Sequence, residues 1–296
     1  MIARALRNPY VLLAAAALFW SGNHVLGRAI AGHVPPLSLS TLRWAVPMPV
    51  LFLLARPHLA ADGAAIRAHW PMLVFLGVTG GALFSALQYV GLQWTTAVNV
   101  SVLNALAPVA IAAAAAIIFG DRLTCWQATG IAVSLAGVLV IVSRGDVQVL
   151  AAFAFNAGDA VIVVNMAIWA VYSAYLRKAP RMHWLSFSFV LATVSAIATA
   201  PFMAWEHLRG YHLQADATTL VAVCYVAVFP SVLAYAAWSR GVAAIGAARA
   251  GVFIYAIPIF SAVMATLFLG ERLMAFHVTG FALIIAGVTL AARRGK

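Results

Sequence analysis

The chain contains two similar segments that lie 150 residues apart. The segment FGDRLTCWQATGIAVSLAGVLVIVSRG, which starts at Phe119, aligns without a gap with LGERLMAFHVTGFALIIAGVTLAARRG, which starts at Leu269. The same spacing relates Pro108 to Pro258 and Gly91 to Gly241. Identical residues in the two segments include Gly120/Gly270, Arg122/Arg272, Leu123/Leu273, Gly130/Gly280, Gly137/Gly287 and Gly145/Gly295. A repeat of this length indicates a chain built from two copies of one structural unit.

The composition places both copies in a membrane. Hydrophobic residues make up 65% of the 296 residues and charged residues 8%, against about 45–50% and about 25% in soluble domains. Apolar runs long enough to cross a bilayer, about 17–25 residues each, follow one another along the chain. We expect an all-α integral membrane protein with ten transmembrane helices, at 10–31, 37–55, 71–92, 96–118, 125–143, 158–176, 184–204, 217–238, 246–268 and 274–292.

Ten spans divide into two copies of five, and five is an odd number, so the second copy must cross the membrane in the opposite sense. The sequence therefore predicts two inverted five-helix repeats, at residues 1–145 and 158–296, joined by a connection at 146–157. The first and sixth spans also match, with Trp20 aligned to Trp169 and Arg28 to Arg177. Inverted repeats of this kind are common in secondary transporters, whose substrate site lies between the halves.

The net charge of +11 is better explained by membrane topology than by a nucleic-acid partner. Positive residues concentrate on the cytoplasmic side of membrane proteins. If both termini are cytoplasmic, that side holds Arg4, Arg7, Arg56, Arg67, Arg122, Arg177, Lys178, Arg181, Arg240, Arg293, Arg294 and Lys296, and the opposite side holds Arg28, Arg144, Arg209 and Arg272. We therefore expect a multi-pass protein of the bacterial inner membrane with both termini in the cytoplasm.

The sequence offers little for catalysis or cofactors. Cys125 and Cys224 lie in or beside helices and suggest neither a disulfide framework nor a metal site. No phosphate-binding G-x-x-x-x-G-K-[ST] motif occurs. No base, nucleophile or metal-ligand set is clustered within the spans, so we predict no enzyme activity, no cofactor and no metal.

Polar and aromatic side chains follow one face of several spans, which indicates the lining of a site, because polar groups facing lipid are costly. The first span places Trp20, Asn23 and His24 on one face, and the sixth places Trp169 and Tyr172 on the corresponding face. The complete predicted lining is Trp20, Asn23, His24, Ser85, Gln88, Tyr89, Ser101, Asn104, Trp169, Tyr172, Tyr235, Trp238 and Tyr255.

Prolines at equivalent positions suggest where the halves bend. Pro108 and Pro258 fall inside the fourth and ninth spans, where a proline removes a helical hydrogen bond. We expect both to act as hinges. Pro230 in the eighth span aligns with Gly80 in the third, so these spans are weakened at matching points too.

Each of these residues also has a purely structural interpretation. The tryptophans could fill space between the halves, and His24 could bond to a neighbouring carbonyl instead of binding cargo or a proton. Arg43 and Arg249 fall within spans as candidate charge contacts, and either side chain could instead reach back to the headgroups. Asn104 and the tyrosines could serve helix contacts.

Several motifs resemble the drug/metabolite transporter superfamily, in particular its bacterial ten-span branch with two EamA-type repeats. The resemblance lies in ALFWSGN near Phe19, LSTLRW near Arg43, and the blocks GDRL…TG…AGV and GERL…TG…AGV, and it covers the whole chain. It implies efflux of amino acids, related metabolites or amphipathic drugs. These motifs describe architecture better than cargo.

We therefore expect a secondary transporter that exports small metabolites by alternating access of its two halves. The aromatic lining favours aromatic or bulky apolar amino acids. An exchanger or importer of the same fold remains an alternative, and a channel is a more distant one. Proton coupling through His24 and uncoupled export both remain open, as does the choice between monomer and homodimer.

Overall fold

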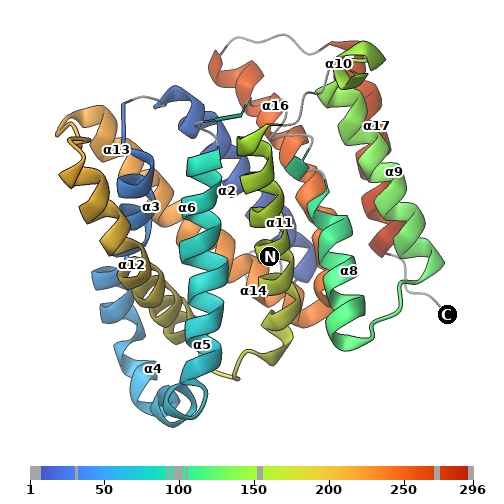
Figure 1. Cartoon of the computed structure of the whole chain (residues 1–296). Helices are drawn as coiled ribbons and strands as arrows, with labels where there is room; N and C mark the ends of the chain where they lie inside the picture. Colours follow the sequence, from blue (N-terminus) through green and yellow to red (C-terminus); the bar gives the residue numbers. More distant parts are fainter. Residues whose placement is uncertain are drawn as a thin grey trace.

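The computed structural model describes residues 8–30, 33–91, 94–95, 103–104, 106–151, 156–269 and 274–292, and within these it is helical throughout apart from turns and connections (Figure 1). The first half contains α2 (Pro9–Ala29), α3 (Pro36–Ala45), α4 (Met48–Ala68), α5 (Trp70–Leu76), η1 (Gly77–Leu83), α6 (Phe84–Gly91), α8 (Ala107–Phe119) and α9 (Cys125–Val142). The short α10 (Val147–Ala151) follows. The second half contains α11 (Ala157–Tyr175), η2 (Leu176–Lys178), α12 (Trp184–Leu208), α13 (Ala217–Val226), η3 (Ala227–Leu233), α14 (Ala234–Ile245), α15 (Ala247–Gly251), η4 (Val252–Tyr255), α16 (Ala256–Leu269) and α17 (Ala275–Ala292).

These elements form ten membrane-spanning helices, as the sequence predicted. Seven continuous helices among the described residues are long and apolar enough to span a bilayer: Pro36–Ala68, Trp70–Gly91, Cys125–Val142, Ala157–Lys178, Trp184–Leu208, Ala217–Ile245 and Ala275–Ala292. The 21-residue α2, the shorter α8 and the broken helix α15–η4–α16 supply the other spans.

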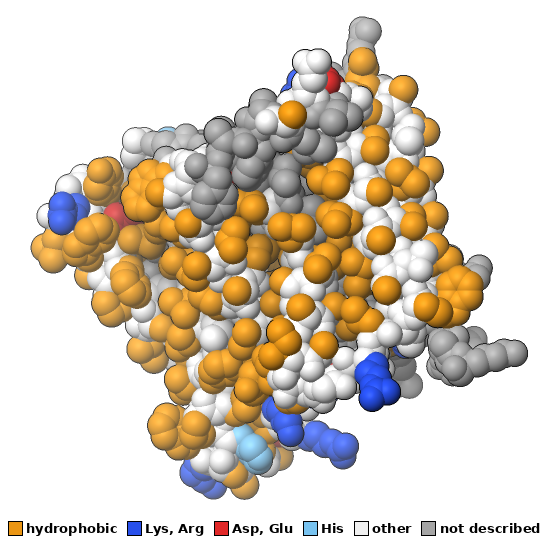
Figure 2. Space-filling view, turned by 45° about the vertical axis from the view of Figure 1, so that its right-hand side comes forward, with side chains coloured by type: hydrophobic (Ala, Val, Ile, Leu, Met, Phe, Trp, Pro, Cys, Tyr) orange, Lys and Arg blue, Asp and Glu red, His pale blue; other side chains and the backbone are white. Residues whose placement is uncertain are grey.

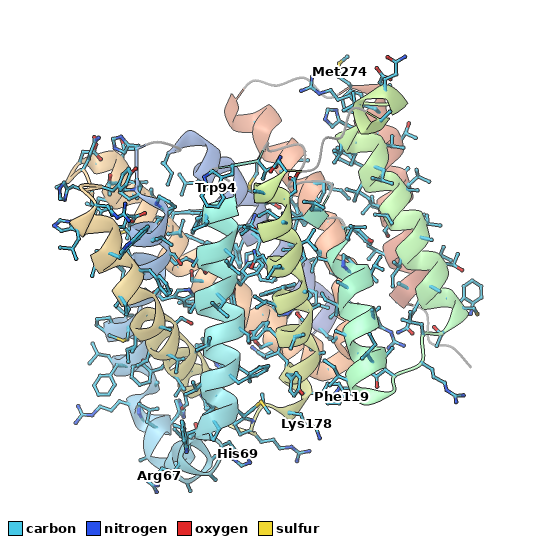
Figure 3. All side chains as sticks on the ribbon, in the orientation of Figure 1. Arg67, His69, Trp94, Phe119, Lys178 and Met274 are labelled. Carbon is cyan, nitrogen blue, oxygen red and sulfur yellow. The ribbon has the colours of Figure 1, made fainter. Side chains whose placement is uncertain are left out.

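The two halves are inverted relative to each other. Phe119, at the end of α8, lies at the lower edge of Figure 3, whereas Met274, which follows α16 just before α17, lies at the upper edge. The connection between the fourth and fifth spans and its counterpart in the second half therefore face opposite sides. In Figure 2 the apolar side chains fill the middle of the visible face, and blue Lys and Arg side chains gather mostly at its lower edge.

The fifth and tenth spans, α9 and α17, show the pseudo-two-fold relation most directly, because they pack against each other over much of their length. A Cβ added to Gly130 would lie 2.5 Å from the carbonyl oxygen of Gly287, and one added to Gly137 would lie 2.7 Å from that of Gly280. Gly280 and Gly287 are the repeat counterparts of Gly130 and Gly137, so the two contacts exchange under the symmetry. The glycines allow the helix backbones to approach closely, as in other membrane helix pairs.

Two connections differ from the sequence prediction. The second predicted span ends at residue 55, but α4 continues to Ala68, and α12 continues to Leu208 beyond the predicted span end at residue 204. The helix at 56–68 continues past the apolar run because its polar side chains can point away from the protein while the backbone keeps its hydrogen bonds. Length of apolar sequence therefore underestimates helix length here.

A buried carboxylate fixes the start of the second span. Glu206 of α12, only 4% exposed, accepts hydrogen bonds from the backbone N–H groups of Leu37 and Ser38 and from the Ser38 hydroxyl, at 2.7–3.1 Å. These N–H groups belong to the first turn of α3, where helical partners are missing and negative charge is stabilised. Glu206 therefore serves as the cap of α3 and joins it to α12.

Candidate substrate site between the two halves

The third and eighth spans each contain a π-helical segment at the same place in the repeat. η1 covers Gly77–Leu83 and η3 covers Ala227–Leu233, so both boundaries differ by 150 residues. A π-helical turn leaves backbone carbonyls without their usual α-helical partners, and such turns are frequent at functional sites. The weakness that Gly80 and Pro230 suggested in the sequence is thus observed in both halves.

Aromatic side chains from both halves form one cluster beside these segments. Trp20 of α2 and Trp169 of α11, which are repeat counterparts, contact each other edge to face with ring centroids 5.4 Å apart. Tyr235 and Trp238 of α14 contact both tryptophans at 5.5–6.0 Å, and Tyr172 contacts Trp169 at 5.1 Å. We call Trp20, Trp169, Tyr172, Tyr235 and Trp238 the aromatic cluster. Edge-to-face contacts of this kind stabilise by about 0.5–1.5 kcal/mol each.

Two members of the aromatic cluster bind the π-helical backbone. The indole Nε1 of Trp20 donates to the Pro230 carbonyl at 3.1 Å, and the Tyr235 hydroxyl donates to the Gly80 carbonyl. Gly80 and Pro230 are repeat counterparts, so equivalent carbonyls of the two halves are satisfied by aromatic donors. Both bonds link different spans, which makes the cluster part of the junction between the halves.

Other polar groups in and beside the cluster have no hydrogen-bond partner among the described residues. The Tyr172 hydroxyl, the Ser173 hydroxyl, the Trp238 indole N–H and the Ser239 hydroxyl are buried and form no hydrogen bond with the described residues. Tyr172 and Ser239 lie close to each other. Buried polar groups are normally paired, and an unpaired one costs about 1–3 kcal/mol. Unpaired donors and acceptors beside a set of aromatic rings are what a site for an amphipathic molecule requires.

The third span contributes residues that already have partners. Ser85 accepts a hydrogen bond from Trp44 Nε1 at 3.2 Å, and Gln88 accepts one from Asn165 Nδ2 at 3.0 Å. Tyr89 accepts one from Arg43. Trp44 and Asn165 were not predicted as lining. Trp44 stands in the LSTLRW segment beside Arg43, and Asn165 lies one turn before Trp169, so helical spacing could have identified the second.

Arg43 points into the protein. It is 3% exposed, its Nε donates to the Ser231 hydroxyl of η3 at 2.9 Å, and its guanidinium carbon lies 5.4 Å from the Trp44 ring centre. This direction excludes the interpretation that the side chain reaches back to the headgroups. The Ser231 hydroxyl itself donates to the Val226 carbonyl, which Pro230 leaves without its α-helical donor.

Other residues of the predicted lining lie away from the aromatic cluster or are not among the described residues. Tyr255 packs with residues of α8, α9 and α17 in a separate apolar group, and its hydroxyl has no partner among the described residues. The Asn104 amide oxygen is also unpaired within this part of the chain, and Asn23 is half-buried on α2. The side chain of His24 and the whole of Ser101 lie outside the described residues.

The two prolines expected inside helices lie near helix starts instead. α8 begins at Ala107, so Pro108 falls in its first turn, and α16 begins at Ala256, so Pro258 does too. A proline is tolerated there because the first-turn N–H groups have no helical acceptor. The ninth span changes to the 3₁₀ segment η4 just before Pro258. The ninth span is thus interrupted one turn before Pro258.

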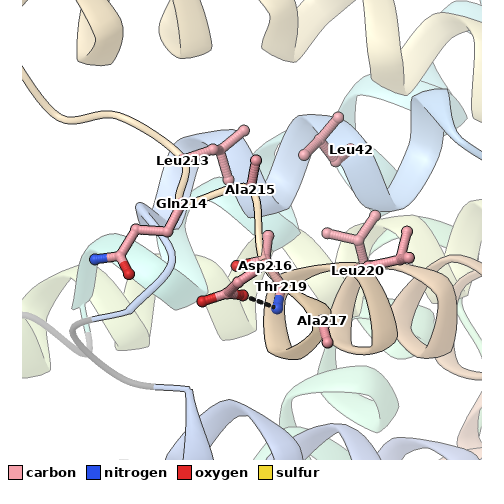
Figure 4. A pocket seen from close by; sticks show the side chains of 9 residues that line it. Leu42, Leu213, Gln214, Ala215, Asp216, Ala217, Thr219 and Leu220 are labelled. Atoms are coloured by element: carbon pink, nitrogen blue, oxygen red, sulfur yellow. Dashed lines mark hydrogen bonds between the residues drawn. The ribbon is translucent and has the colours of Figure 1, made fainter.

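Two cavities lie toward the ends of the bundle. One of about 670 Å³ lies between α3 and the start of α13, with Asp216 capping α13 in its wall (Figure 4). The other, of about 190 Å³, lies at the α8–α9 connection and is lined by Asp121, Arg122, Gln127 and Arg249 among others. The Nε of Arg249 is buried and unpaired within the described residues. No group of three or more potential metal ligands occurs among the described residues.

The comparison with protein families decides the identity of the fold. The model of the EamA-like transporter family matches residues 7–143 and again residues 156–293. The chain belongs to the EamA-like transporter family. The resemblance to the drug/metabolite transporter superfamily is thereby confirmed, and the protein is a multi-pass membrane transporter rather than an enzyme.

Several EamA relatives extend over most of the chain. An uncharacterized transporter of Bacillus subtilis is 25% identical over 96% of this chain and 93% of its own length. A probable terminal-alkyne amino-acid exporter of Streptantibioticus cattleyicolor is 30% identical over 76% and 73%. A probable amino-acid metabolite efflux pump of Salmonella typhimurium is 25% identical over 91% and 89%. A solved crystal structure superposes with a TM-score of 0.78 at 22% identity, covering 96% of both chains, which shows a shared fold.

Proposed function

We propose that this EamA protein is a secondary transporter that exports amino acids, with aromatic or bulky apolar amino acids as preferred cargo, by alternating access of its inverted halves. The observation that supports this most is the contact between the repeat counterparts Trp20 and Trp169 inside the aromatic cluster. Two relatives with amino-acid export or efflux in their names are in keeping with it. We place both termini in the cytoplasm, from the distribution of arginine and lysine.

The aromatic cluster gives the proposed cargo its chemistry. Rings from three helices offer stacking surface to an aromatic or bulky side chain. The hydroxyl and indole groups of Tyr172, Ser173 and Trp238, which have no hydrogen-bond partner among the described residues, offer hydrogen bonds to its polar end. Little fixed charge lies in the cluster, which suits a zwitterion better than a highly charged metabolite.

The closed packing of the cluster favours a moving carrier. Trp169, Tyr172, Tyr235 and Trp238 are each at most 3% exposed, so cargo reaches them only when the halves separate on one side. The π-helical segments η1 and η3 lie at equivalent places in the two halves and are the natural points of bending. The broken spans at Pro108 and Pro258 supply a second matching pair. We keep these prolines as proposed hinges.

Counterflow in proteoliposomes tests the function. Liposomes are preloaded with a mixed amino-acid pool and given labelled tryptophan, phenylalanine, threonine or methionine outside. Saturable uptake of the aromatic tracers supports a carrier with aromatic cargo, and a channel would give no exchange. Trp20→Ala and Trp169→Ala should abolish or strongly reduce uptake, whereas Trp205→Ala, an exposed tryptophan of α12, should leave it unchanged. Unaltered uptake in both cluster variants would contradict the proposed site.

Coupling to protons is tested in the same vesicles. Among the described carboxylates, Asp159 is buried but already bound to Asn156 and Thr95 at the start of α11. His24 therefore remains our candidate for proton coupling, and uncoupled export down a metabolite gradient is the alternative. A pH gradient that drives uptake equally in wild-type protein and in His24→Ala would remove His24 from the mechanism.

A further inference from the structure

We infer that Arg43 forms a carboxylate-binding site at the edge of the aromatic cluster and selects cargo that combines a carboxylate with a bulky apolar group. This inference deepens the proposed function and rests on it for the identity of the cargo. It concerns a binding contact, so it can be tested without transport.

The charge of Arg43 is buried without a counter-ion among the described residues. The ion pairs in this part of the chain are His33–Asp216 and Arg177–Asp121. Glu206, the carboxylate that caps the same helix, α3, is bound to Leu37 and Ser38. An arginine inside a membrane protein is costly and normally pairs with an acid or lines a pathway for charged cargo.

The Arg43 guanidinium has N–H donors beyond those that bond to the described residues. Two of its five N–H groups have acceptors among the described residues, the hydroxyl oxygens of Ser231 at 2.9 Å and Tyr89 at 3.4 Å. Both acceptors are neutral, and the contact with Tyr89 is long. A carboxylate binds a guanidinium through two parallel N–H bonds, which the remaining donors can supply. The Ser231 contact holds the side chain in place while leaving that capacity unused.

The surroundings of Arg43 connect it to the aromatic cluster. Its guanidinium lies beside Trp44, and the Trp44 ring contacts Tyr235 of the aromatic cluster with centroids 5.0 Å apart. A carboxylate at Arg43 would therefore have aromatic surface next to it, where an apolar side chain could lie. The Tyr172 ring lies 6.1 Å from that of Tyr235, and its hydroxyl, which has no partner in the part of the chain that the structure describes, adds an acceptor near the same surface.

The repeat shows that the fold does not require this charge. The counterpart of Arg43 in the second half is Ala192 or Thr193, depending on which of the two repeat spacings is applied to the second span. Thr193 donates within its own helix, to the Phe189 carbonyl. The equivalent helix, α12, thus packs without an arginine at this position. We therefore assign the charge of Arg43 to a function of the first half and not to packing.

Ligand-dependent thermal stability of the purified protein tests the site. Melting in detergent is followed by size-exclusion chromatography after heating, with four probes at equal concentration: tryptophan, indole-3-acetate, tryptophanamide and tryptamine. Wild-type protein should be stabilised by the two carboxylates at concentrations about ten- to a hundredfold lower than by the two probes without one. In Arg43→Gln this preference should disappear. Arg43→Lys keeps the positive charge but loses the two parallel N–H donors of the guanidinium, so the preference for carboxylates should be reduced but not lost. This variant also provides the test if Arg43→Gln fails to fold.

Control variants separate a specific role of Arg43 in carboxylate binding from a general effect of losing one arginine. Arg67→Gln and Arg209→Gln each remove an exposed arginine at a helix end, of α4 and of α12; both should keep the preference for carboxylates. Equal preference in wild type and Arg43→Gln, or in wild type and Arg43→Lys if the first variant is unfolded, would overturn the inference. So would a wild-type protein that ignores both carboxylates. Carboxylate binding through Arg43 without counterflow of any amino acid would instead overturn the proposed function and leave this site standing.

Discussion

The helix pair α9–α17 and the central region around η1 and η3 obey the same pseudo-symmetry in different ways. In the helix pair, glycines of α9 lie against glycines of α17, with Gly130 against Gly287 and Gly137 against Gly280. In the central region the backbone repeats but the side chains do not, since Gly80 and its successor in η1 correspond to Pro230 and Ser231 in η3. Where these helices pack, the glycines at the contact are the same in both copies. Where we propose that cargo binds, each half supplies different chemistry to a matching backbone.

The largest effect should come from filling the symmetric contact. Gly137→Leu places a side chain where a single Cβ would already lie 2.7 Å from the Gly280 carbonyl oxygen. We expect the free energy of unfolding to fall by about 1–3 kcal/mol or more, because backbone atoms cannot move aside cheaply. The melting temperature in detergent measures it. Ala136→Leu, on the exposed side of the same helix, is the control, and an equal loss there would show that the crossing is not the cause.

A smaller effect should follow from removing one hydroxyl in the central region. Tyr235→Phe leaves the Gly80 carbonyl without its donor, so we expect a loss of about 1–3 kcal/mol in the free energy of unfolding. Tyr255→Phe removes a buried hydroxyl that has no partner among the described residues, and stability should stay the same or rise. The two melting temperatures compare tyrosines of matching burial. If both variants lose the same stability, the bond to the π-helical segment has no special role.

The smallest effect concerns pH and lies outside both regions. The pKa of His183, which precedes α12, is lowered by partial burial and by the neighbouring His58, against the opposing effect of Asp62. The His183 ring stacks on His58 with centroids 3.5 Å apart, and its Nδ1 accepts from the Leu185 N–H, while Trp184 lies beside it. A lowered pKa favours the neutral form in the folded state, so this contribution to stability is present above the ordinary histidine pKa and is lost as pH falls through the lowered value.

Melting temperatures measured from pH 8 to pH 5 check this effect. The wild-type protein should lose stability toward the acidic end, and His183→Asn, which keeps a side chain able to cap the helix, should lose less. His212→Asn, an exposed histidine that contacts His207 away from this pair, is the control and should follow the wild type. The same acid sensitivity in His183→Asn would assign the titration to another group.

The sequence predicted the architecture because repetition and apolar length are direct consequences of a membrane fold. Ten spans, their inversion and the matching weak points at Gly80 and Pro230 followed from residue spacing alone. The aromatic cluster was also foreseen in part, because Trp20, Trp169, Tyr172, Tyr235 and Trp238 occupy helix faces that the spacing had selected. The assignment of these residues to cargo binding stays a prediction.

Other features depend on contacts between distant segments and could not be read from spacing. Helical periodicity shows which face Arg43 occupies but not that its side chain binds Ser231, 188 positions away. Glu206 lies near the end of a span, where an acid is unremarkable, and only the fold shows that it caps α3. Tyr255 has the right helical face, yet the break before α16 directs it toward α9 and α17 instead.

Sided labelling of single cysteines tests most directly whether the central region opens while the symmetric pair stays closed. Cys125 and Cys224, both exposed, are first replaced by serine. Ser173→Cys then places a thiol beside the aromatic cluster, and Ser134→Cys places one in the α9–α17 contact, and both parent serines are fully buried. We predict that a membrane-impermeant thiol reagent reaches position 173 from either side of the membrane, that tryptophan slows this reaction, and that position 134 stays unlabelled. Position 173 unlabelled from both sides during active exchange would contradict alternating access to the aromatic cluster.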